Sequence, residues 1–389
     1  MPDAPVPQGY VIDPAAPARR LVVVQLLPAL ENGGAERSTL EVARALVAAG
    51  HRSVVVSAGG RMVRQLEAEG SEHVTLDIGS KSLRSLTRIG TLRRTLAAIR
   101  PDIVHARSRM PAWLAWLALR GMRPKPAFVT TVHGLNSPGA WSGIMIRGDR
   151  VIAVSQSVRD FLLGHYPRVD AARLTVIPRG IDPEAFPYGY RAEPTWRDAF
   201  FAEYPQLAGA PLLTLPGRGT RLKGHADAIA LIAGLRERGI DARLLLLGIV
   251  ERGREAYLRE MQQLAEARGV SDIVVFSPPR SDVRDVFAVS DLVLQLSNKP
   301  ESFGRTVIEA LSLCRPVLGY AHGGVGELLA ELYPAGRVPA GDVDKLIVRA
   351  AELLGRAPPI APLQRYHLSD MQAAVLALYE ELAAARHDS

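Results

Sequence analysis

Short apolar runs that alternate with helical patterns constrain the fold of this chain more than any other feature of its sequence. A first series comprises residues 21–27, 53–58, 102–107, 127–134, 150–155 and 174–180, and a second comprises residues 211–217, 242–248, 273–277, 292–297 and 316–320. Continuous apolar runs bounded by turn residues are typical of parallel strands that helices cover on both faces. Stretches with helical spacing separate the runs, as in residues 34–50. The sequence therefore predicts an α/β protein with two doubly wound parallel sheets.

The length of the chain predicts how it is divided. With 389 residues it exceeds the usual size of one hydrophobic core, so we expect two domains. We place the first at residues 21–186 and the second at residues 187–368, joined near the Pro- and aromatic-rich stretch 183–210. A Pro- and Ala-rich arm, residues 1–20, precedes them, and a final helix, residues 369–389, follows. The two sheets are expected to face each other across a cleft, with ligands at the carboxyl ends of the strands.

The positive charge of the chain is concentrated in its first half. Residues 1–186 hold 24 Lys and Arg against 15 Asp and Glu, a balance of +9, whereas the whole chain has a net charge of +7. This asymmetry indicates an anionic partner for the first domain. In residues 81–100, Lys81, Arg84 and Arg88 recur at helical spacing among leucines, which fits a basic helix at an anionic membrane surface. The solvated face of a core helix would give the same pattern, so both interpretations stay open.

The composition disfavours several other classes of protein. No apolar run approaches the roughly 20 residues that span a bilayer, and residues 1–20 lack the apolar core of a signal peptide. The single Cys314 fits a reducing cytoplasm. An isoelectric point of 9.7 would suit nucleic-acid binding, but the basic runs lack interleaved aromatic residues. A dehydrogenase would need a GxGxxG fingerprint, which is absent. We also expect no metal site, because no His or Cys residues stand at metal-ligand spacing.

Glycine and polar residues follow several predicted strands. Gly33 and Gly34 precede a helix, where bare amides can approach a ligand at the positive helix end, although a tight turn alone would use the same residues. His133 ends a strand and can donate a hydrogen bond to a sugar hydroxyl or a phosphate, or it can be structural. Arg218 and Lys223 flank a glycine loop, where Arg can fork onto two oxygens and Lys acts as a point charge. This pair suits a diphosphate, and a solvated basic loop is the alternative.

Two glutamates eight residues apart, Glu301 and Glu309, flank a phenylalanine–glycine pair in the segment ESFGRTVIE. On an ideal helix they would point roughly 80° apart and could not converge on one atom. If Glu301 lies in the loop before the helix, each glutamate can reach a different part of one ligand. A helix start favours an acidic residue such as Glu301 through the helix dipole. That explanation does not cover Glu309, which lies among apolar neighbours and needs a partner, for which Arg305 is a candidate.

In combination these residues carry a resemblance to a known family. The chain resembles retaining glycosyltransferases of the GT-B fold, in the large family-4 group, over about residues 21–385. The most specific element is the E-x7-E signature, here Glu301 to Glu309. The supporting segments are GGAER, TVHG, AVSQSV, VIPRGID, GRGTRLKG and HGGVGE. Each is weak alone, and their order and spacing make the resemblance.

The resemblance implies a nucleotide-sugar donor, a UDP-sugar first and a GDP-sugar second, held mostly by the second domain. Glu309 would bind the ribose hydroxyls and Glu301 the hydroxyls of the transferred sugar. Arg218 and Lys223 would neutralise the diphosphate, and His133 would lie by the sugar and the departing phosphate. The remaining donor contacts would come from Gly33, Gly34, Arg280, Phe303, Gly304 and Arg305. Such enzymes are generally metal-independent, need no cofactor and retain configuration by front-face attack without a protein nucleophile. The final helix would cross back to the first domain.

Two departures from the family pattern bear on the acceptor. Arg179 stands where many relatives carry Asn, and Arg107 and Arg109 stand where many have a second His. We therefore expect an anionic glycan or glycolipid acceptor, such as a phosphorylated lipopolysaccharide core, on the cytoplasmic face of the inner membrane. Glucose from UDP-glucose is the first expectation for the transferred sugar. A GT-B-type sugar-nucleotide epimerase is the alternative, and it would form product without any acceptor.

Overall fold

The computed structural model describes residues 19–31, 33–80 and 87–386. Its chain forms two compact units. The first comprises the residues up to Val154, then Arg159–Ile177 and Ser369–Ser389. The second comprises Ser155–Val158 and Pro178–Leu368. The main boundary therefore falls at Pro178, earlier than the sequence pattern places it, and the last helix returns to the first unit.

The first unit contains a seven-stranded parallel sheet with the order β3-β2-β1-β4-β5-β6-β7. Its strands are β1 (Val22–Leu26), β2 (Arg52–Ser57), β3 (Glu72–Thr75), β4 (Ile103–Ala106), β5 (Ala127–Val132), β6 (Arg150–Ala153) and β7 (Leu174–Val176). The inner strands are buried along almost their whole length, as helices on both faces require. The helices are α1 (Gly34–Ala48), α2 (Val63–Ala68), α3 (Thr87–Ile99), α4 (Arg109–Leu119), α5 (Gln156–His165) and α13 (Leu368–Ala384), and the short 3-10 turns are η2 (Ser142–Ile146) and η3 (Ala171–Arg173).

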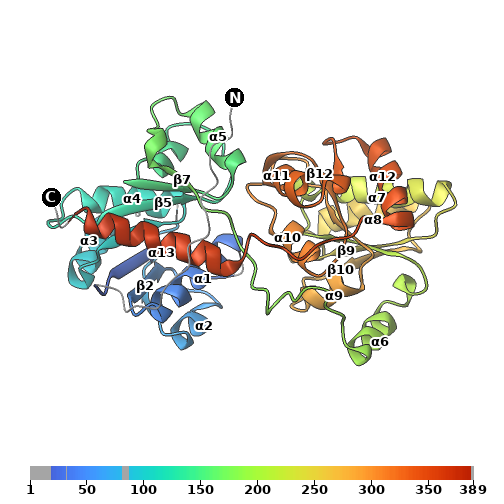
Figure 1. Ribbon diagram of the computed structural model, residues 1–389, viewed down its shortest axis with the longest axis horizontal. Helices are drawn as coiled ribbons and strands as arrows, with labels where there is room; N and C mark the ends of the chain where they lie inside the picture. The colour runs from blue at the N-terminus through green and yellow to red at the C-terminus, as the bar shows by residue number, and fades with distance from the viewer. Residues whose placement is uncertain (1–18, 32, 81–86, 387–389) are drawn as a thin grey trace. The chain divides into compact units, whose positions relative to one another are not determined.

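The second unit contains a six-stranded parallel sheet with the order β10-β9-β8-β11-β12-β13. Its strands are β8 (Leu212–Pro216), β9 (Arg243–Leu247), β10 (Val274–Ser277), β11 (Leu292–Gln295), β12 (Val317–Tyr320) and β13 (Arg337–Val338). The helices are α6 (Pro194–Glu203), α7 (His225–Glu237), α8 (Glu255–Ala267), α9 (Val283–Val289), α10 (Arg305–Ser312), α11 (Gly323–Leu332) and α12 (Val343–Arg356), with 3-10 turns η4 (Pro205–Leu207), η5 (Arg221–Lys223) and η6 (Pro334–Gly336). Figure 1 shows the strands and helices of each unit. Both sheets thus confirm the predicted doubly wound α/β class.

Helix α13 (red in Figure 1) packs on the first unit through buried side chains. The Tyr379 hydroxyl lies 2.5 Å from His105 Nδ1, and Gln372 donates to the carbonyl of Glu41 on α1 at 2.8 Å. Tyr379 is fully buried, and burial raises the pKa of its hydroxyl to about 12. These contacts make the last helix part of the first unit, although the whole second unit separates it in sequence from β7.

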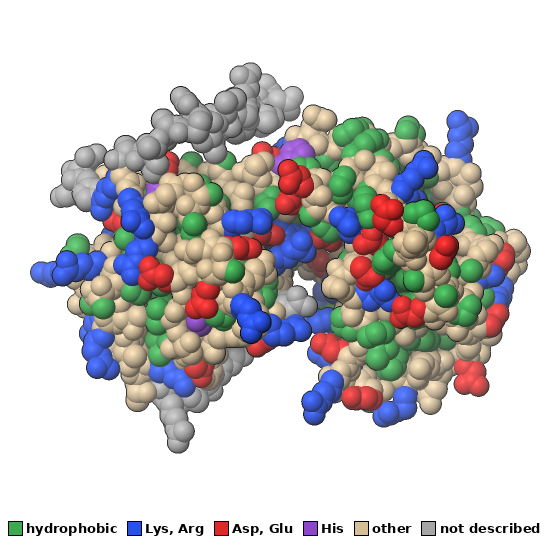
Figure 2. All heavy atoms as spheres, turned by 90° about the horizontal axis from the view of Figure 1, so that it is seen from below, with side chains coloured by type: hydrophobic (Ala, Val, Ile, Leu, Met, Phe, Trp, Pro, Cys, Tyr) green, Lys and Arg blue, Asp and Glu red, His purple; other side chains and the backbone are tan. Residues whose placement is uncertain are grey.

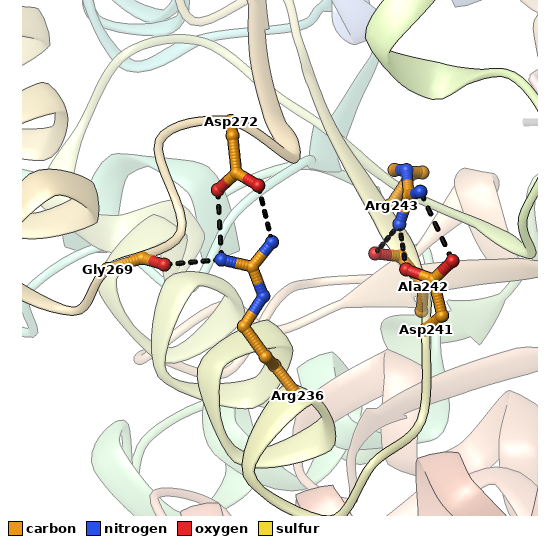
Figure 3. Close-up of polar contacts among 6 residues, drawn as sticks. All are labelled: Arg236, Asp241, Ala242, Arg243, Gly269 and Asp272. Carbon is orange, nitrogen blue, oxygen red and sulfur yellow. Dashed lines mark hydrogen bonds and ion pairs between the residues drawn. The ribbon is translucent and has the colours of Figure 1, made fainter.

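Two ion pairs lie at the amino end of the second sheet (Figure 3). Arg236 near the end of α7 forks onto Asp272, with Nη2–Oδ2 at 2.6 Å, and also donates to the carbonyl of Gly269. Arg243, which begins β9, pairs with Asp241. The guanidinium groups lower the pKa of both carboxyls. Because these pairs are largely exposed, we expect each of them to add little to the free energy of unfolding.

Candidate functional site

The strand order places a ligand site in each sheet. In both units the order reverses in the middle, between β1 and β4 in the first and between β8 and β11 in the second. Doubly wound sheets bind ligands outside the carboxyl ends of the strands at such a switch point. In the second unit the loops after β8 and β11 carry Lys223 and Glu301, and these two side chains meet.

Lys223 and Glu301 form a partly buried ion pair at this switch point. Lys223 Nζ lies 2.6 Å from Glu301 Oε1, and the Ser297 hydroxyl donates to the same oxygen. The side chains of Lys223 and Glu301 are 29% and 24% exposed, so a ligand can reach both. The loop position of Glu301, before α10, agrees with the geometry that the E-x7-E spacing predicts. The pair brings together a cation suited to phosphate and a carboxylate suited to hydroxyls.

Helix α10 begins directly beside this pair. Gly304 caps it with φ of 100° and ψ of 54°, a left-handed conformation that glycine adopts at little cost. The first amides of α10 lie at the positive end of the helix dipole, which favours an anion. About one turn on, Glu309 is 8% exposed. The predicted donor residues Phe303, Gly304, Arg305 and Glu309 thus belong to one helix start, with Phe303 buried and Arg305 donating to the carbonyl of Gly180 at 3.0 Å.

The start of α11 packs onto the same loop, backbone against backbone. Gly324 donates its amide to the Glu301 carbonyl at 2.8 Å, and a Cβ on Gly324 would lie 2.5 Å from Phe303 Cα. Glu301 also forms an isolated parallel bridge with Gly323. His322 contacts the carbonyl of Ser297 through Nε2 at 2.8 Å. The glycines of HGGVGE therefore let a second helix start hold the Glu301 loop in place.

Two other predicted donor residues lie at the same sheet edge in different settings. Arg218 follows β8 and has an exposed side chain. Arg280 follows β10, the outer strand, and its guanidinium donates to Asp282 at 2.9 and 2.8 Å and to Glu203 at 2.8 Å. These carboxylates raise the pKa of Arg280. Arg280 thus ties the loop after β10 to α6, and the structure does not bring it to the pair formed by Lys223 and Glu301.

The predicted residues of the first unit lie at the ends of β1 and β5. Gly33 caps α1, and its amide donates to Glu36 Oε2 at 2.7 Å. A Cβ on Gly34 would meet nothing within 4 Å, so the backbone there is open to a ligand. His133 follows β5 directly and is half-buried. Their roles in donor binding and catalysis stay predictions.

Arg107 lies elsewhere than the sequence pattern suggests. We expected it at the acceptor surface, but it is 3% exposed and donates through Nε to Gln25 Oε1 at 2.8 Å. Burial lowers the pKa of its guanidinium. The residue follows β4 at the switch point, where its side chain turns inward against β1 and α1. In this structure Arg107 organises the interior of the first unit.

The other two predicted acceptor residues belong to different units. Arg109 begins α4 and donates to the Ser142 hydroxyl at 3.3 Å in the first unit. Arg179 is half-buried and belongs to the second unit, because the boundary falls at Pro178. Lys81 and Arg84 of the predicted basic helix lie outside the described residues, and Arg88 pairs with Asp77 on the first unit. Figure 2 shows Lys and Arg side chains spread over the face it presents, with acidic side chains among them.

Sequence reasoning missed several residues that build the site in the second unit. Ser297 and His322 hold the Glu301 loop, and Asn298 donates to the carbonyl of Arg221 at 3.0 Å. His225, fully buried at the start of α7, contacts the Tyr257 hydroxyl at 3.2 Å, and burial lowers its pKa to about 4. Two signals could have pointed to them: the position of all four after β8, β11 or β12, and the place of His322 in the HGGVGE segment.

The described residues were compared with two further kinds of site, a metal centre and a membrane span. Among these residues, no three His, Cys, Asp or Glu side chains gather in a way that could hold a metal ion. Among the same residues, no helix combines the length and the apolar character that crossing a bilayer requires.

The two doubly wound parallel sheets are those of the GT-B fold. Residues 32–185 match the model of Glycosyltransferase Family 4, and residues 197–358 match the model of Glycosyl transferases group 1. The chain therefore has the GT-B fold and carries both of these glycosyltransferase domains.

Known proteins agree with this assignment. A glycosyltransferase from Rickettsia africae ESF-5 superposes with a TM-score of 0.81 at 26% identity, covering 93% of this chain and 98% of that one. Anabaena Alr3699/HepE in complex with UDP-glucose superposes with a TM-score of 0.72 at 19% identity, covering 95% and 100%. A D-inositol 3-phosphate glycosyltransferase of Xylanimonas cellulosilytica is 29% identical over 243 residues. That match covers 58% of this chain and only 56% of the relative's own length.

Proposed function

We propose that the chain transfers a hexose from a nucleotide sugar to a hydroxyl of an anionic acceptor, with retention of configuration and without a metal ion. UDP-glucose is the first candidate donor, and its complex with the similarly folded HepE supports that choice. The observation that carries the proposal is the 2.6 Å pair of Lys223 and Glu301 at the switch point, beside the amide end of α10.

Different residues of the second unit would bind different parts of the donor. Lys223, Arg218 and the first amides of α10 would stabilise the negative charge that grows on the leaving diphosphate. Glu301 would accept hydrogen bonds from the transferred sugar, and Glu309 from the ribose. Neither glutamate is the attacking group, because the acceptor hydroxyl would attack from the face on which the diphosphate leaves. Diphosphate would also compete with Glu301 for Lys223, freeing the carboxylate for sugar hydroxyls as the donor binds.

The acceptor is proposed to carry a phosphate. The +9 charge balance of residues 1–186 supports an anionic acceptor. A membrane-associated glycan or glycolipid, such as a lipopolysaccharide core, is the first candidate, with the protein peripheral on the cytoplasmic face of the inner membrane. The name of the Xylanimonas relative favours a second candidate, a small phosphorylated polyol in solution.

Donor binding can be tested by calorimetric titration of UDP-glucose and GDP-mannose into the wild type, Lys223→Ala and Glu309→Gln. We expect each substitution to weaken binding of the preferred donor roughly tenfold or more, since each removes a charge-assisted contact. Arg221→Ala is the matched control, because Arg221 lies two residues from Lys223 but is exposed and pairs with Glu260 at 2.6 Å. If no nucleotide sugar binds, or if the control loses as much affinity, the site is misassigned.

Product analysis separates transfer from epimerisation. The enzyme is incubated with the donor that binds, with and without a phosphorylated lipopolysaccharide core or inositol phosphate. Transfer predicts a new α- or β-linked product whose anomeric configuration matches that of the donor. Conversion of the donor sugar to its epimer without any acceptor would overturn the proposal in favour of an epimerase.

A further inference from the structure

A basic pocket lies in the first unit, away from the switch point. Its lining comes from Trp116, Leu119, Arg120, Lys125, Phe128, Arg147 and Asp149. Phe128 is near the start of β5 and Asp149 precedes β6, so the pocket lies at the amino edge of the sheet. The predicted donor and catalytic residues follow the carboxyl ends of the strands. The pocket is therefore separate from the site already described.

Three cations line this pocket, and two of them lie over one aromatic ring. The guanidinium of Arg120 lies 3.5 Å from the centroid of the Trp116 ring, and that of Arg147 lies 4.7 Å from it. Lys125 lines the same pocket. Trp116 attracts the two arginines through its π face, but it cannot neutralise their charge. The helix dipole favours a cation at the end of α4, which can explain one of the three cations but not the other two.

The single carboxylate of the pocket is already engaged. Asp149 Oδ2 accepts from Arg386 at 2.6 Å and from the amide of Phe128 at 2.9 Å. Within the part of the chain that the structure describes, Arg120, Lys125 and Arg147 form no ion pair. The lining therefore carries three cations and one carboxylate, and a bound dianion would offset the excess positive charge.

A row of tryptophans leads from the pocket to the surface. Trp113 packs edge-on against Trp116 with ring centroids 5.6 Å apart and stacks on Trp141 at 6.1 Å. Its indole Nε1 donates to the Trp141 carbonyl at 3.0 Å, which fixes the row. Trp141 is 41% exposed. Exposed tryptophan beside cations is the composition that protein surfaces present at the headgroup level of a membrane.

We propose that this pocket binds a phosphate monoester, either free in solution or as the headgroup of an anionic lipid. Arg120 and Arg147 present planar forks that match phosphate oxygens, and Lys125 adds a point charge. The site does not depend on the proposed sugar transfer, because none of its residues belongs to the donor site. A lipid headgroup there would hold the first unit at a membrane with Trp141 at the interface.

Two binding measurements with wild type, R120Q/R147Q and R64Q test the proposal. Arg64 is an exposed arginine on α2 of the same unit, which makes R64Q the matched control. Glycerol 3-phosphate is titrated while tryptophan fluorescence is followed, and phosphatidylcholine vesicles with and without phosphatidic acid are used in flotation. We expect the double variant to bind glycerol 3-phosphate roughly tenfold more weakly or worse, and R64Q to match the wild type. Circular dichroism verifies that each variant is folded.

The two arms distinguish the source of the phosphate. Phosphatidic-acid-dependent flotation that R120Q/R147Q loses and R64Q keeps identifies a lipid headgroup. Binding of glycerol 3-phosphate with the same variant pattern, but without flotation of the wild type, identifies a soluble phosphate. Equal behaviour of the double variant and the wild type in both arms, or equal losses in R64Q, would overturn the proposal, since binding would then come from overall charge or from another site.

Discussion

The contact of Gly324 with Phe303 shows how much of the candidate site depends on one missing side chain. A Cβ at position 324 would lie 2.5 Å from Phe303 Cα and 2.6 Å from its carbonyl oxygen, closer than real Cβ contacts. Both atoms are backbone, so no side-chain rotation can relieve the clash. The two helix starts would have to move apart, and the loop that carries Glu301 would move with them.

Gly324→Ala is therefore expected to lower the free energy of unfolding by about 1–3 kcal/mol, as overpacking does in well-packed interiors. It should also weaken donor binding, because the Glu301 loop is displaced. Urea unfolding and calorimetric titration measure the two effects. Gly90→Ala is the control: a Cβ there meets nothing within 4 Å, and alanine in helix α3 should add roughly 0.5–1 kcal/mol. Equal stability of both variants would contradict the packing argument.

The buried His225 should make the second unit sensitive to acid. Burial lowers its pKa from 6.5 to about 4, so the imidazole stays neutral in the folded state. In the unfolded chain it takes up a proton near pH 6.5. The stabilising contribution is therefore present above pH 6.5 and is lost as the pH falls toward 4. By linkage this loss amounts to about 3 kcal/mol relative to a variant that cannot titrate.

His225→Gln provides that comparison, with urea unfolding measured from pH 7 to 4 as the readout. The wild type should lose stability faster than the variant below pH 6.5. Other buried histidines, such as His51 with its lowered pKa, contribute equally to both proteins and cancel in the difference. Parallel curves for the two proteins would show that His225 does not titrate as its burial implies.

Among the elements, the strands were the easiest to predict. Each apolar run of the two series forms a strand of one of the sheets. The two strands that the pattern missed are β3 and β13, both at sheet edges. β3 is largely exposed and β13 has two residues, so neither shows a continuous apolar run. The stretch 183–210, taken as a connection, contains α6, whose Phe200 is buried among aromatic side chains. Edge and connecting elements are set by tertiary packing, which a local pattern cannot show.

Parts of the candidate site could be predicted where the local sequence indicates the secondary structure of a residue. Residues whose placement depends on tertiary packing could not be predicted in this way. Glu309 lies inside a helix, as its apolar neighbours indicated, and Glu301 lies in the loop before it, an arrangement that the sequence left as one possibility. Nothing in the local sequence distinguishes Arg107 from a surface arginine. Its burial depends on the contact with Gln25, which is 82 residues away along the chain. Ser297 belongs to none of the quoted motifs, and His322 opens HGGVGE but was not predicted as a site residue. Their function in holding the Glu301 loop emerges only from the fold.

Helix α13 should contribute more to the first unit than its distance along the chain suggests. Tyr379→Phe removes the hydroxyl that contacts His105 at 2.5 Å and should lower stability by about 0.5–1.5 kcal/mol. Tyr379→Ala also leaves a cavity and should cost about 3–5 kcal/mol. Glu381→Gln, on the same helix, breaks an exposed pair with Arg150 and should change stability by less than about 1 kcal/mol. Thermal unfolding of the three variants tests this order, and a large effect of Glu381→Gln would contradict it.

For the whole molecule, the discontinuity of the first unit has a consequence for folding. The second unit consists mainly of one continuous segment, Pro178–Leu368, whereas the first needs Ser369–Ser389 to complete it. A fragment of residues 178–368 keeps its whole sheet and the pair of Lys223 and Glu301. A fragment ending at Ile177 leaves exposed the surface that Tyr379 and its helix cover.

Expressed alone, residues 178–368 should therefore unfold cooperatively and bind nucleotide sugar, because the proposed donor contacts of Glu301, Glu309 and Lys223 all lie within them. Residues 19–177 should be unstable, since His105 loses its Tyr379 partner and the apolar face beneath α13 meets water. Adding residues 369–389 to that fragment, through a flexible linker or as a separate peptide, should restore cooperative unfolding. Circular dichroism with thermal unfolding measures all three. A stable 19–177 fragment that gains nothing from the added helix would show that α13 rests on the first unit without completing it.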